Sequence, residues 1–322
     1  MCYKFTGCAE KSITRGSQQI DSYAFIGNNK YTLLNINDCP FELAKFSLKK
    51  NLKNFNKIDL LLTGYGGAGP YPQCFNNLKK NEKKEEASLK KEKFLKMATD
   101  YIDLAQPRYY LPFAGKYVLG GKLAKLNNLR GVPDLTEAYE FLEKYYMKKN
   151  CKNIKSLKLN PGSHFDFSSK TLSSDYKPID KKKYESFLKS ISKKSMNYEK
   201  DPLPNLEQIK KLSDIAFLKC VEKNKKLKNI FDTKIFINFK IGILKLSLSD
   251  EKMSFEKKNF FHKNKVKNFV EYKVDPKLFY RLLKGPKYAH WNNAEIGSHI
   301  QYKRKPNIFN RRVYQSVCYF HN

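Results

Sequence analysis

Residues 58–75, which read IDLLLTGYGGAGPYPQCF, decide the fold of this chain. The apolar run at 58–63 is typical of a short buried strand, and the loop at 64–72 holds too many glycines for either a helix or a strand. Apolar side chains then recur at helical spacing until Pro107, which precedes another apolar run at 108–113. This order of strand, loop, helix and strand predicts an α/β layered domain in the first half of the chain.

The sequence on either side predicts further elements. Upstream, we expect two strands joined by a hairpin turn, at 23–26 and 31–36. Downstream, we expect helices at 134–148, 206–216 and 276–283, and strands near 157–159, at 234–248 and at 265–274. The predicted organisation is a first domain at 1–165, a linker with a helix at 166–204, and a smaller α+β domain at 205–322.

The composition favours a solvated lysine surface. The 322 residues carry a formal net charge of +32, but only seven of the 63 basic residues are arginine, the side chain that proteins favour for reading nucleic acid. A face that attracts phosphate or other anions is the alternative. No stretch is long and apolar enough for a membrane helix, and no leader opens the chain, so we predict a cytoplasmic protein. Seven scattered cysteines without a CxxC pair argue against a disulfide framework and a zinc ribbon.

Polar residues stand where the predicted strands of the first half end. The strand at 31–36 runs into Asn37 and Asp38, the next runs into the glycine-rich loop, and a third ends at 112–115. Because the carboxyl ends of parallel strands meet at one edge of a sheet, a carboxylate delivered there is placed to bind a metal or act as a base. Capping of the following turn is the alternative role for Asp38. The loop lacks the GK[ST] ending and the immediate helix of nucleotide-binding loops, so it does not predict a nucleotide site.

Four segments together resemble a known family. They are LLNINDCPF at 33–41, IDLLLTGYGGAGPYPQCF at 58–75, MATDYIDLAQPRYYLPFAG at 97–115 and LNPG at 159–162. Their succession is similar to the later part of a metallo-β-lactamase-fold domain, in the branch of CMP-N-acetylneuraminate hydroxylase-like and ascorbate-6-phosphate lactonase-like proteins. Residues 290–321 are similar to the tail of the hydroxylase-like proteins. The resemblance implies a partial αββα metallo-β-lactamase-like sandwich followed by a smaller α+β C-terminal domain.

The resemblance also implies a zinc or iron centre, and here the sequence departs from the family. The family binds its metal with an HxHxDH loop, a third histidine, a bridging aspartate at a strand end and a final histidine. Only the bridging aspartate carries over, onto Asp38, because residues 1–163 contain no histidine. A metal centre needs three or more ligands, so we expect this chain alone to provide a partial site. His164, or thiolates from Cys39 and Cys74, are the alternatives for further ligands.

Two parts of the chain supply residues for a substrate pocket. By the resemblance, the glycine-rich loop walls the pocket. In the C-terminal segment, aromatic, amide and guanidinium groups suit an anionic sugar or nucleotide ligand. The candidate pocket residues are Tyr65, Gly66, Gly67, Tyr71, Trp291, Asn292 and Arg304. The alternative is that the C-terminal segment packs the core of the second domain, with Arg304 paired to a carboxylate.

These observations predict a metal-dependent hydrolase or hydroxylase of a polar, sugar-derived substrate that is incomplete as an isolated chain. The expected partners are an upstream-encoded half that supplies the histidines, or further copies of the chain, and an anionic small molecule. Two other functions stay open. One is a non-enzymatic binding or scaffold protein for an anionic ligand or a partner subunit, and the other is a lysine-rich protein associated with nucleic acid.

Overall fold

The computed structural model describes residues 6–7, 22–151, 153–256 and 266–322. The chain forms two compact units that are discontinuous in sequence. Unit 1 comprises residues 1–67, 88–117 and 131–186, and unit 2 comprises residues 68–87, 118–130 and 187–322. The chain therefore leaves unit 1 for unit 2 inside the glycine-rich loop, between Gly67 and Ala68.

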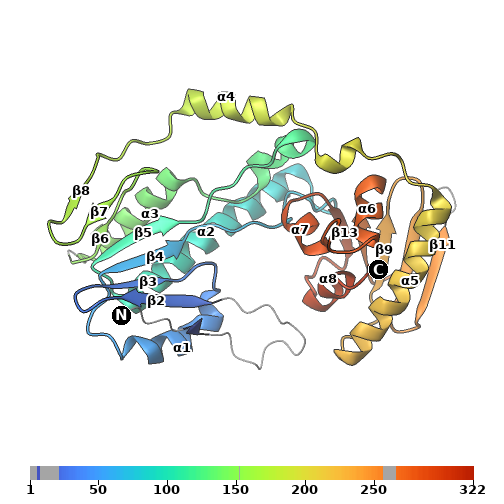
Figure 1. Ribbon diagram of the computed structural model, residues 1–322, viewed down its shortest axis with the longest axis horizontal. Helices are drawn as coiled ribbons and strands as arrows, with labels where there is room; N and C mark the ends of the chain where they lie inside the picture. The colour runs from blue at the N-terminus through green and yellow to red at the C-terminus, as the bar shows by residue number, and fades with distance from the viewer. Residues whose placement is uncertain (1–5, 8–21, 152, 257–265) are drawn as a thin grey trace. The chain divides into compact units, whose positions relative to one another are not determined.

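Unit 1 is built on one sheet in which the strand order follows the chain order (Figure 1). Its strands are β1 (Thr6–Gly7), β2 (Tyr23–Gly27), β3 (Thr32–Asn35), β4 (Leu60–Gly64), β5 (Tyr109–Phe113) and β6 (Lys155–Ser156). β2 and β3 form an antiparallel hairpin, whereas β3, β4, β5 and β6 are parallel neighbours. The α/β layered arrangement predicted for the first half is confirmed. The strand expected near 157–159 is displaced to 155–156.

Helices carry the chain between the parallel strands and pack on one face of this sheet. They are α1 (Phe41–Leu52), α2 (Lys80–Ala105) and α3 (Leu135–Lys148). The core between them and the sheet includes Leu34, Leu61 and Tyr110 from the strands and Leu48, Ile102 and Leu142 from the helices. α3 begins where the sequence predicts. Asp134 Oδ1 accepts a hydrogen bond from the Glu137 N–H at 2.9 Å, and the Asp134 N–H donates to Glu137 Oε2 at 2.7 Å.

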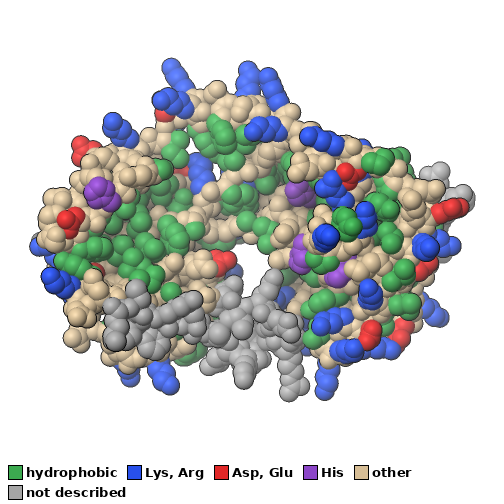
Figure 2. All heavy atoms as spheres, in the orientation of Figure 1, with side chains coloured by type: hydrophobic (Ala, Val, Ile, Leu, Met, Phe, Trp, Pro, Cys, Tyr) green, Lys and Arg blue, Asp and Glu red, His purple; other side chains and the backbone are tan. Residues whose placement is uncertain are grey.

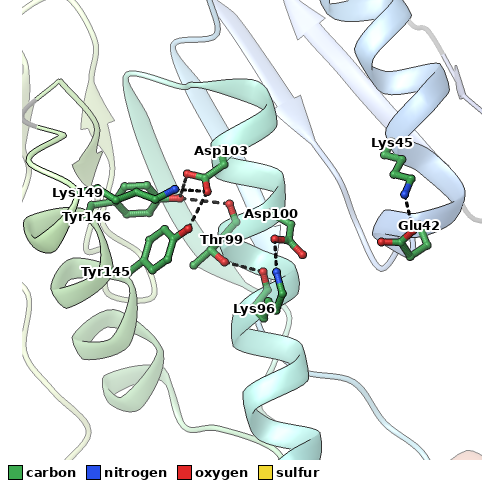
Figure 3. A network of polar contacts seen from close by, with 9 residues as sticks. All are labelled: Glu42, Lys45, Lys96, Thr99, Asp100, Asp103, Tyr145, Tyr146 and Lys149. Atoms are coloured by element: carbon green, nitrogen blue, oxygen red, sulfur yellow. Dashed lines mark hydrogen bonds and ion pairs between the residues drawn. The ribbon is translucent and has the colours of Figure 1, made fainter.

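The carboxylate of Asp103 on α2 forms hydrogen bonds that link α2 to α3 (Figure 3). Asp103 accepts hydrogen bonds from the Tyr145 hydroxyl at 2.8 Å, the Tyr146 hydroxyl at 3.1 Å and Lys149 Nζ at 2.6 Å. Burial and then the Asp103 charge raise the pKa of Tyr146, so this hydroxyl keeps its proton and donates it. Because α3 and Lys149, the residue that follows it, supply three donors to its oxygens, we assign Asp103 a structural role.

The opposite face of the unit 1 sheet has a thinner cover. We call its apolar cluster the leucine face. It consists of Leu60, Tyr109 and Leu157, which are buried, and of Leu33, Leu62, Leu111 and Leu159, which are half-buried. Part of the cover comes from the hairpin of β7 (Phe165–Asp166) and β8 (Thr171–Leu172), where the Phe165 ring lies 4.9 Å from the Tyr109 ring. Figure 2 shows hydrophobic side chains gathered over these strands.

Unit 2 contains a five-stranded sheet. The strand order is β11 (Lys252–Glu256), β10 (Ile243–Ser247), β9 (Lys234–Asn238), β12 (Phe269–Lys273) and β13 (Gln301–Lys305). β9 and β12 are parallel, and the other pairs are antiparallel. The prediction of a single strand at 234–248 is wrong, because the chain reverses at 239–242, where Lys240 has a φ of 71°.

The helices of the second half include α5 (Leu206–Lys226), α6 (Pro276–Leu283), α7 (Trp291–Ile296) and α8 (Arg311–Val317). α6 begins where the sequence predicts, because Asp275 Oδ1 accepts a hydrogen bond from the Lys277 N–H at 3.0 Å and proline occupies the first turn. Aromatic rings join this helix to the sheet and to α7. The Phe279 ring stacks 4.9 Å from the Phe239 ring and lies 6.2 Å from the Trp291 ring.

Residues 166–204 are more ordered than a linker with one helix. The expected helix is present as α4 (Lys181–Ser192). The β7–β8 hairpin precedes it, and the short helix η2 (Asn197–Lys200) follows it. A second short helix, η1 (Gly121–Leu129), lies in the part of unit 2 that is inserted between two segments of unit 1.

Candidate functional site

The carboxyl ends of β3, β4 and β5 lie at one edge of the unit 1 sheet, as the sequence predicts. Asp38 follows β3 in a turn where Asn37 has a φ of 55°, and its side chain is exposed. Gly64, at the end of β4, packs against this turn, because a Cβ at Gly64 would lie 3.3 Å from the Asn37 carbonyl oxygen. No hydrogen bond or ion pair among the described residues uses the Asp38 carboxylate. The acid is therefore free at the edge where the strands end.

Close packing explains the glycines that follow β4 and β5. A Cβ on Gly115 would overlap Cε2 of the Tyr65 ring, and a Cβ on Gly67 would lie 2.7 Å from Cζ of Phe94. A Cβ on Gly66 would lie 2.8 Å from the Gly115 carbonyl oxygen. Burial raises the pKa of Tyr65 to about 12, so its hydroxyl is neutral near pH 7. This part of the loop is a tightly packed connection.

The residues that the sequence predicts for one pocket belong to two different units. The members in unit 1 are Tyr65, Gly66 and Gly67, and the members in unit 2 are Tyr71, Trp291, Asn292 and Arg304. Trp291 is 3% exposed, and its Nε1 donates a hydrogen bond to the Phe320 carbonyl oxygen at 2.8 Å, so the indole belongs to the core of unit 2. Asn292 is half-buried, and its N–H donates to His290 Nδ1 at 3.1 Å.

Tyr71 and Arg304 do come together within unit 2. The guanidinium carbon of Arg304 lies 5.7 Å from the centre of the Tyr71 ring and 4.6 Å from the centre of the Phe75 ring. The expectation that Arg304 pairs with a carboxylate is wrong for the described residues, whose ion pairs do not include it. Its neighbours in the described structure are aromatic rings, an amide and a hydroxyl.

The described residues do not fit the zinc or iron centre that the resemblance implies. They bring together no group of three or more His, Cys, Asp or Glu side chains that would hold a metal. Cys39 is buried beside Asp38, while Cys74 belongs to unit 2, where its Sγ lies 3.7 Å from the Ser298 carbonyl oxygen. His164 is exposed next to the β7–β8 hairpin. His262 lies outside the described residues. We therefore assign no reaction step to a metal.

A group of buried polar side chains in unit 2 does not follow from the sequence motifs. Tyr272 and Tyr302 are cross-strand partners on β12 and β13, with ring centroids 5.0 Å apart, and neither is more than 1% exposed. Among the described residues, neither hydroxyl has a hydrogen-bond partner. Burial raises the pKa of both hydroxyls and of the Tyr314 hydroxyl, and the charge of half-buried Glu295 on α7 raises these pKa values further. Burial raises the pKa of Glu295 to about 7.

A pocket of about 630 Å³ opens in unit 2 and is lined by residues of α5, β10 and β11. On its wall, Lys234 Nζ donates to Ser247 Oγ and to Asp250 Oδ2, both at 2.7 Å. A lysine activates a serine as a nucleophile only when the lysine is neutral. Here the hydrogen bond from Lys234 lowers the pKa of Asp250 to about 2, so the acid is ionised, and Lys234 Nζ forms an ion pair with it at 2.7 Å. This group is an ion-paired turn and is unsuited to nucleophilic catalysis.

No protein-family model and no curated protein matches this sequence. In the part of the chain that the structure describes, no helix is both long enough and apolar enough to cross a bilayer.

Proposed function

We propose that unit 1 is one sheet-and-helix layer of a metallo-β-lactamase-like αββα sandwich. In this proposal the chain is a component of a metal-dependent hydrolase or hydroxylase that acts on a polar, sugar-derived substrate. The observation that carries the proposal is the unequal cover of the two faces of the unit 1 sheet. The helices α1, α2 and α3 all pack on one face, whereas four of the seven residues of the leucine face are only half-buried.

The unequal cover supports a two-layer architecture for a physical reason. In an αββα sandwich each sheet carries helices on its outer face and packs its inner face on a second sheet about 10 Å away. Leucines on neighbouring parallel strands, such as Leu33, Leu62 and Leu111, suit that inner face. Burying their exposed area is favourable by about 25 cal/mol per Å². A second layer, either encoded upstream or carried by another chain, would supply this burial.

The position of Asp38 agrees with the bridging aspartate of this family. It follows a parallel strand, its side chain is exposed, and no donor among the described residues occupies its oxygens. One carboxylate does not hold a metal ion, so the remaining ligands must come from the second layer. For this reason we expect the isolated chain to lack metal-dependent activity.

Metal analysis tests the ligand shortage. We expect the chain, purified after growth with zinc and iron, to contain far less than one metal per molecule by inductively coupled plasma mass spectrometry. The Asp38→Asn variant should have the same content. Stoichiometric zinc or iron in the isolated chain, lost in Asp38→Asn, would contradict the proposal, because it would require a complete site in this polypeptide.

Binding of the apolar dye 1-anilinonaphthalene-8-sulfonate tests the leucine face. Leu111→Lys places a charge on that face and should reduce the dye fluorescence of the folded chain. The matched control is Phe46→Lys on α1, because Phe46 is 65% exposed and does not lie on the leucine face. If both variants bind the dye like the parent chain, the leucine face is not open to a second layer.

A further inference from the structure

Arg304 on β13 is buried without a neutralising charge. Its side chain is 8% exposed, Nε donates to Asn307 Oδ1 at 2.9 Å, and Nη1 donates to the Tyr314 hydroxyl at 3.4 Å. Among the hydrogen bonds of the described residues, none uses Nη2. The rings of Tyr71 and Phe75 cover one side of the guanidinium group. These contacts fix the orientation of the group and leave N–H donors on Nη1 and Nη2 for another acceptor.

The acidic residues around Arg304 leave its charge uncompensated. Burial raises the pKa of each tyrosine near Arg304, and a neighbouring acid raises it further. This acid is Glu86 for Tyr71, and it is Glu295 for Tyr272, Tyr302 and Tyr314. Glu271 on neighbouring β12 accepts a hydrogen bond from Asn238 Nδ2 at 3.0 Å. None of these acids forms an ion pair with Arg304 in the described structure. A guanidinium group removed from water without an anionic partner is destabilising, although its aromatic contacts offset part of this cost.

The rim next to Arg304 is apolar. In the turn after β13, Asn307 Oδ1 accepts the hydrogen bond from Arg304 Nε. The next two residues, Ile308 and Phe309, are 69% and 61% exposed. The centre of the Phe309 ring lies 5.1 Å from the centre of the Tyr314 ring, and the Tyr314 hydroxyl accepts a hydrogen bond from Arg304. Large apolar side chains that stay exposed beside an oriented cation are typical of a surface completed by a ligand.

We infer that Arg304 anchors a binding site for a small ligand that joins an oxyanion to an apolar group. The oxyanion, a carboxylate or a phosphate, accepts hydrogen bonds from Nη1 and Nη2, a pair of donors that matches two oxygens of one acid. The apolar group contacts Ile308 and Phe309. This site lies within unit 2 and does not depend on the metal ligands or the second layer of the proposed function, so the two proposals fail independently.

The test uses the full chain and three probes, namely phenyl phosphate, benzoate and inorganic phosphate. Binding is measured by isothermal titration calorimetry at constant ionic strength, and the comparison of phenyl phosphate with benzoate separates phosphate from carboxylate. We expect saturable binding of one of the two aromatic probes, with inorganic phosphate at least tenfold weaker. Arg304→Met should weaken the aromatic probe at least tenfold, while Lys303→Met, which removes an exposed cation from the same strand, should change it less than twofold.

A second variant keeps the test valid if Arg304→Met does not fold. Phe309→Ser removes an exposed ring, so the fold should survive, and affinity for the aromatic probe should fall several-fold while that for inorganic phosphate is unchanged. The inference is overturned if none of the probes saturates. It is also overturned if Lys303→Met weakens binding as much as Arg304→Met, because binding would then reflect the general positive charge of the chain.

Discussion

Replacing Glu295 by glutamine should change how the stability of unit 2 depends on pH. Glu295 is half-buried on α7, close to the hydroxyls of Tyr272 and Tyr302, and burial raises its pKa from 4.5 to about 7. In the unfolded chain the carboxyl group ionises near its usual pKa. Between these two values the folded chain keeps a proton that the unfolded chain has released.

The sign and size of the effect follow from this difference. Because the folded state binds more protons, the free energy of unfolding falls as pH rises from about 4.5 to about 7, and it becomes level above that range. Each unit of pKa corresponds to about 1.4 kcal/mol, so the total loss is about 3 kcal/mol. Glutamine carries no titrating proton and keeps a similar shape. The Glu295→Gln variant should therefore be more stable than the parent chain at pH 8, with a much smaller difference at pH 4.5.

Trp291 provides the assay. It is the only tryptophan, it lies on the same helix as Glu295, and it is buried, so its fluorescence during urea unfolding reports on unit 2. Burial lowers the pKa of His299 in the same unit, which makes stability rise with pH, but this contribution is common to both proteins and cancels in their difference. Glu207→Gln, at an exposed site on α5, is the matched control for the loss of one carboxylate and should not reproduce the gain in stability at pH 8. If the difference between parent and Glu295→Gln is also constant from pH 4.5 to 8, Glu295 is not held in its neutral form.

Three further substitutions, two of them with a matched comparison variant, test the packing by far-UV circular dichroism during urea unfolding. Gly115→Ala should destabilise the chain by about 1–3 kcal/mol, because the added Cβ would overlap the Tyr65 ring. Gly69→Ala should be nearly neutral, because no atom lies within 4 Å of the position that its Cβ would take. Tyr272→Phe should change stability little, because the hydroxyl has no described partner, while Tyr101→Phe should lose about 1 kcal/mol with its 2.7 Å hydrogen bond to the Cys39 carbonyl oxygen. Asp134→Ala should lose about 1 kcal/mol with the cap of α3, and an unchanged stability would contradict the capping role.

Local signals account for the parts of the fold that were predicted from the sequence. The apolar runs at 58–63 and 108–113 became β4 and β5, and the predicted helix starts at 134 and 276 lie within one residue of the starts of α3 and α6. The reversal between β9 and β10 was missed because apolar residues recur on both sides of the turn, and the two turn residues that depart from the strand pattern, Lys240 and Gly242, alternate with apolar ones. A continuous strand pattern gives no position for a turn.

Long-range placement limited the prediction of the site. Asp38 was located correctly at a sheet edge because it directly follows a strand. The surroundings of Arg304 were not predictable, because the segment around Phe75 folds beside β13, where the Tyr302 N–H donates to the Cys74 carbonyl oxygen at 2.8 Å. A pairing over more than two hundred residues leaves no periodic pattern in the sequence. Without it, a buried arginine suggests a carboxylate partner, and the aromatic neighbours are not foreseen.

The neutral form of Glu295 and the free charge of Arg304 support each other physically. Both residues act on the Tyr314 hydroxyl, Arg304 through a hydrogen bond and Glu295 through its charge. An ionised Glu295 would place a negative charge near this tyrosine, and that charge would oppose an oxyanion approaching Nη1 and Nη2 of Arg304. While Glu295 keeps its proton, below about pH 7, the positive potential of Arg304 toward a ligand is undiminished. The burial that raises the pKa of the acid therefore also keeps the arginine suitable for binding an anion.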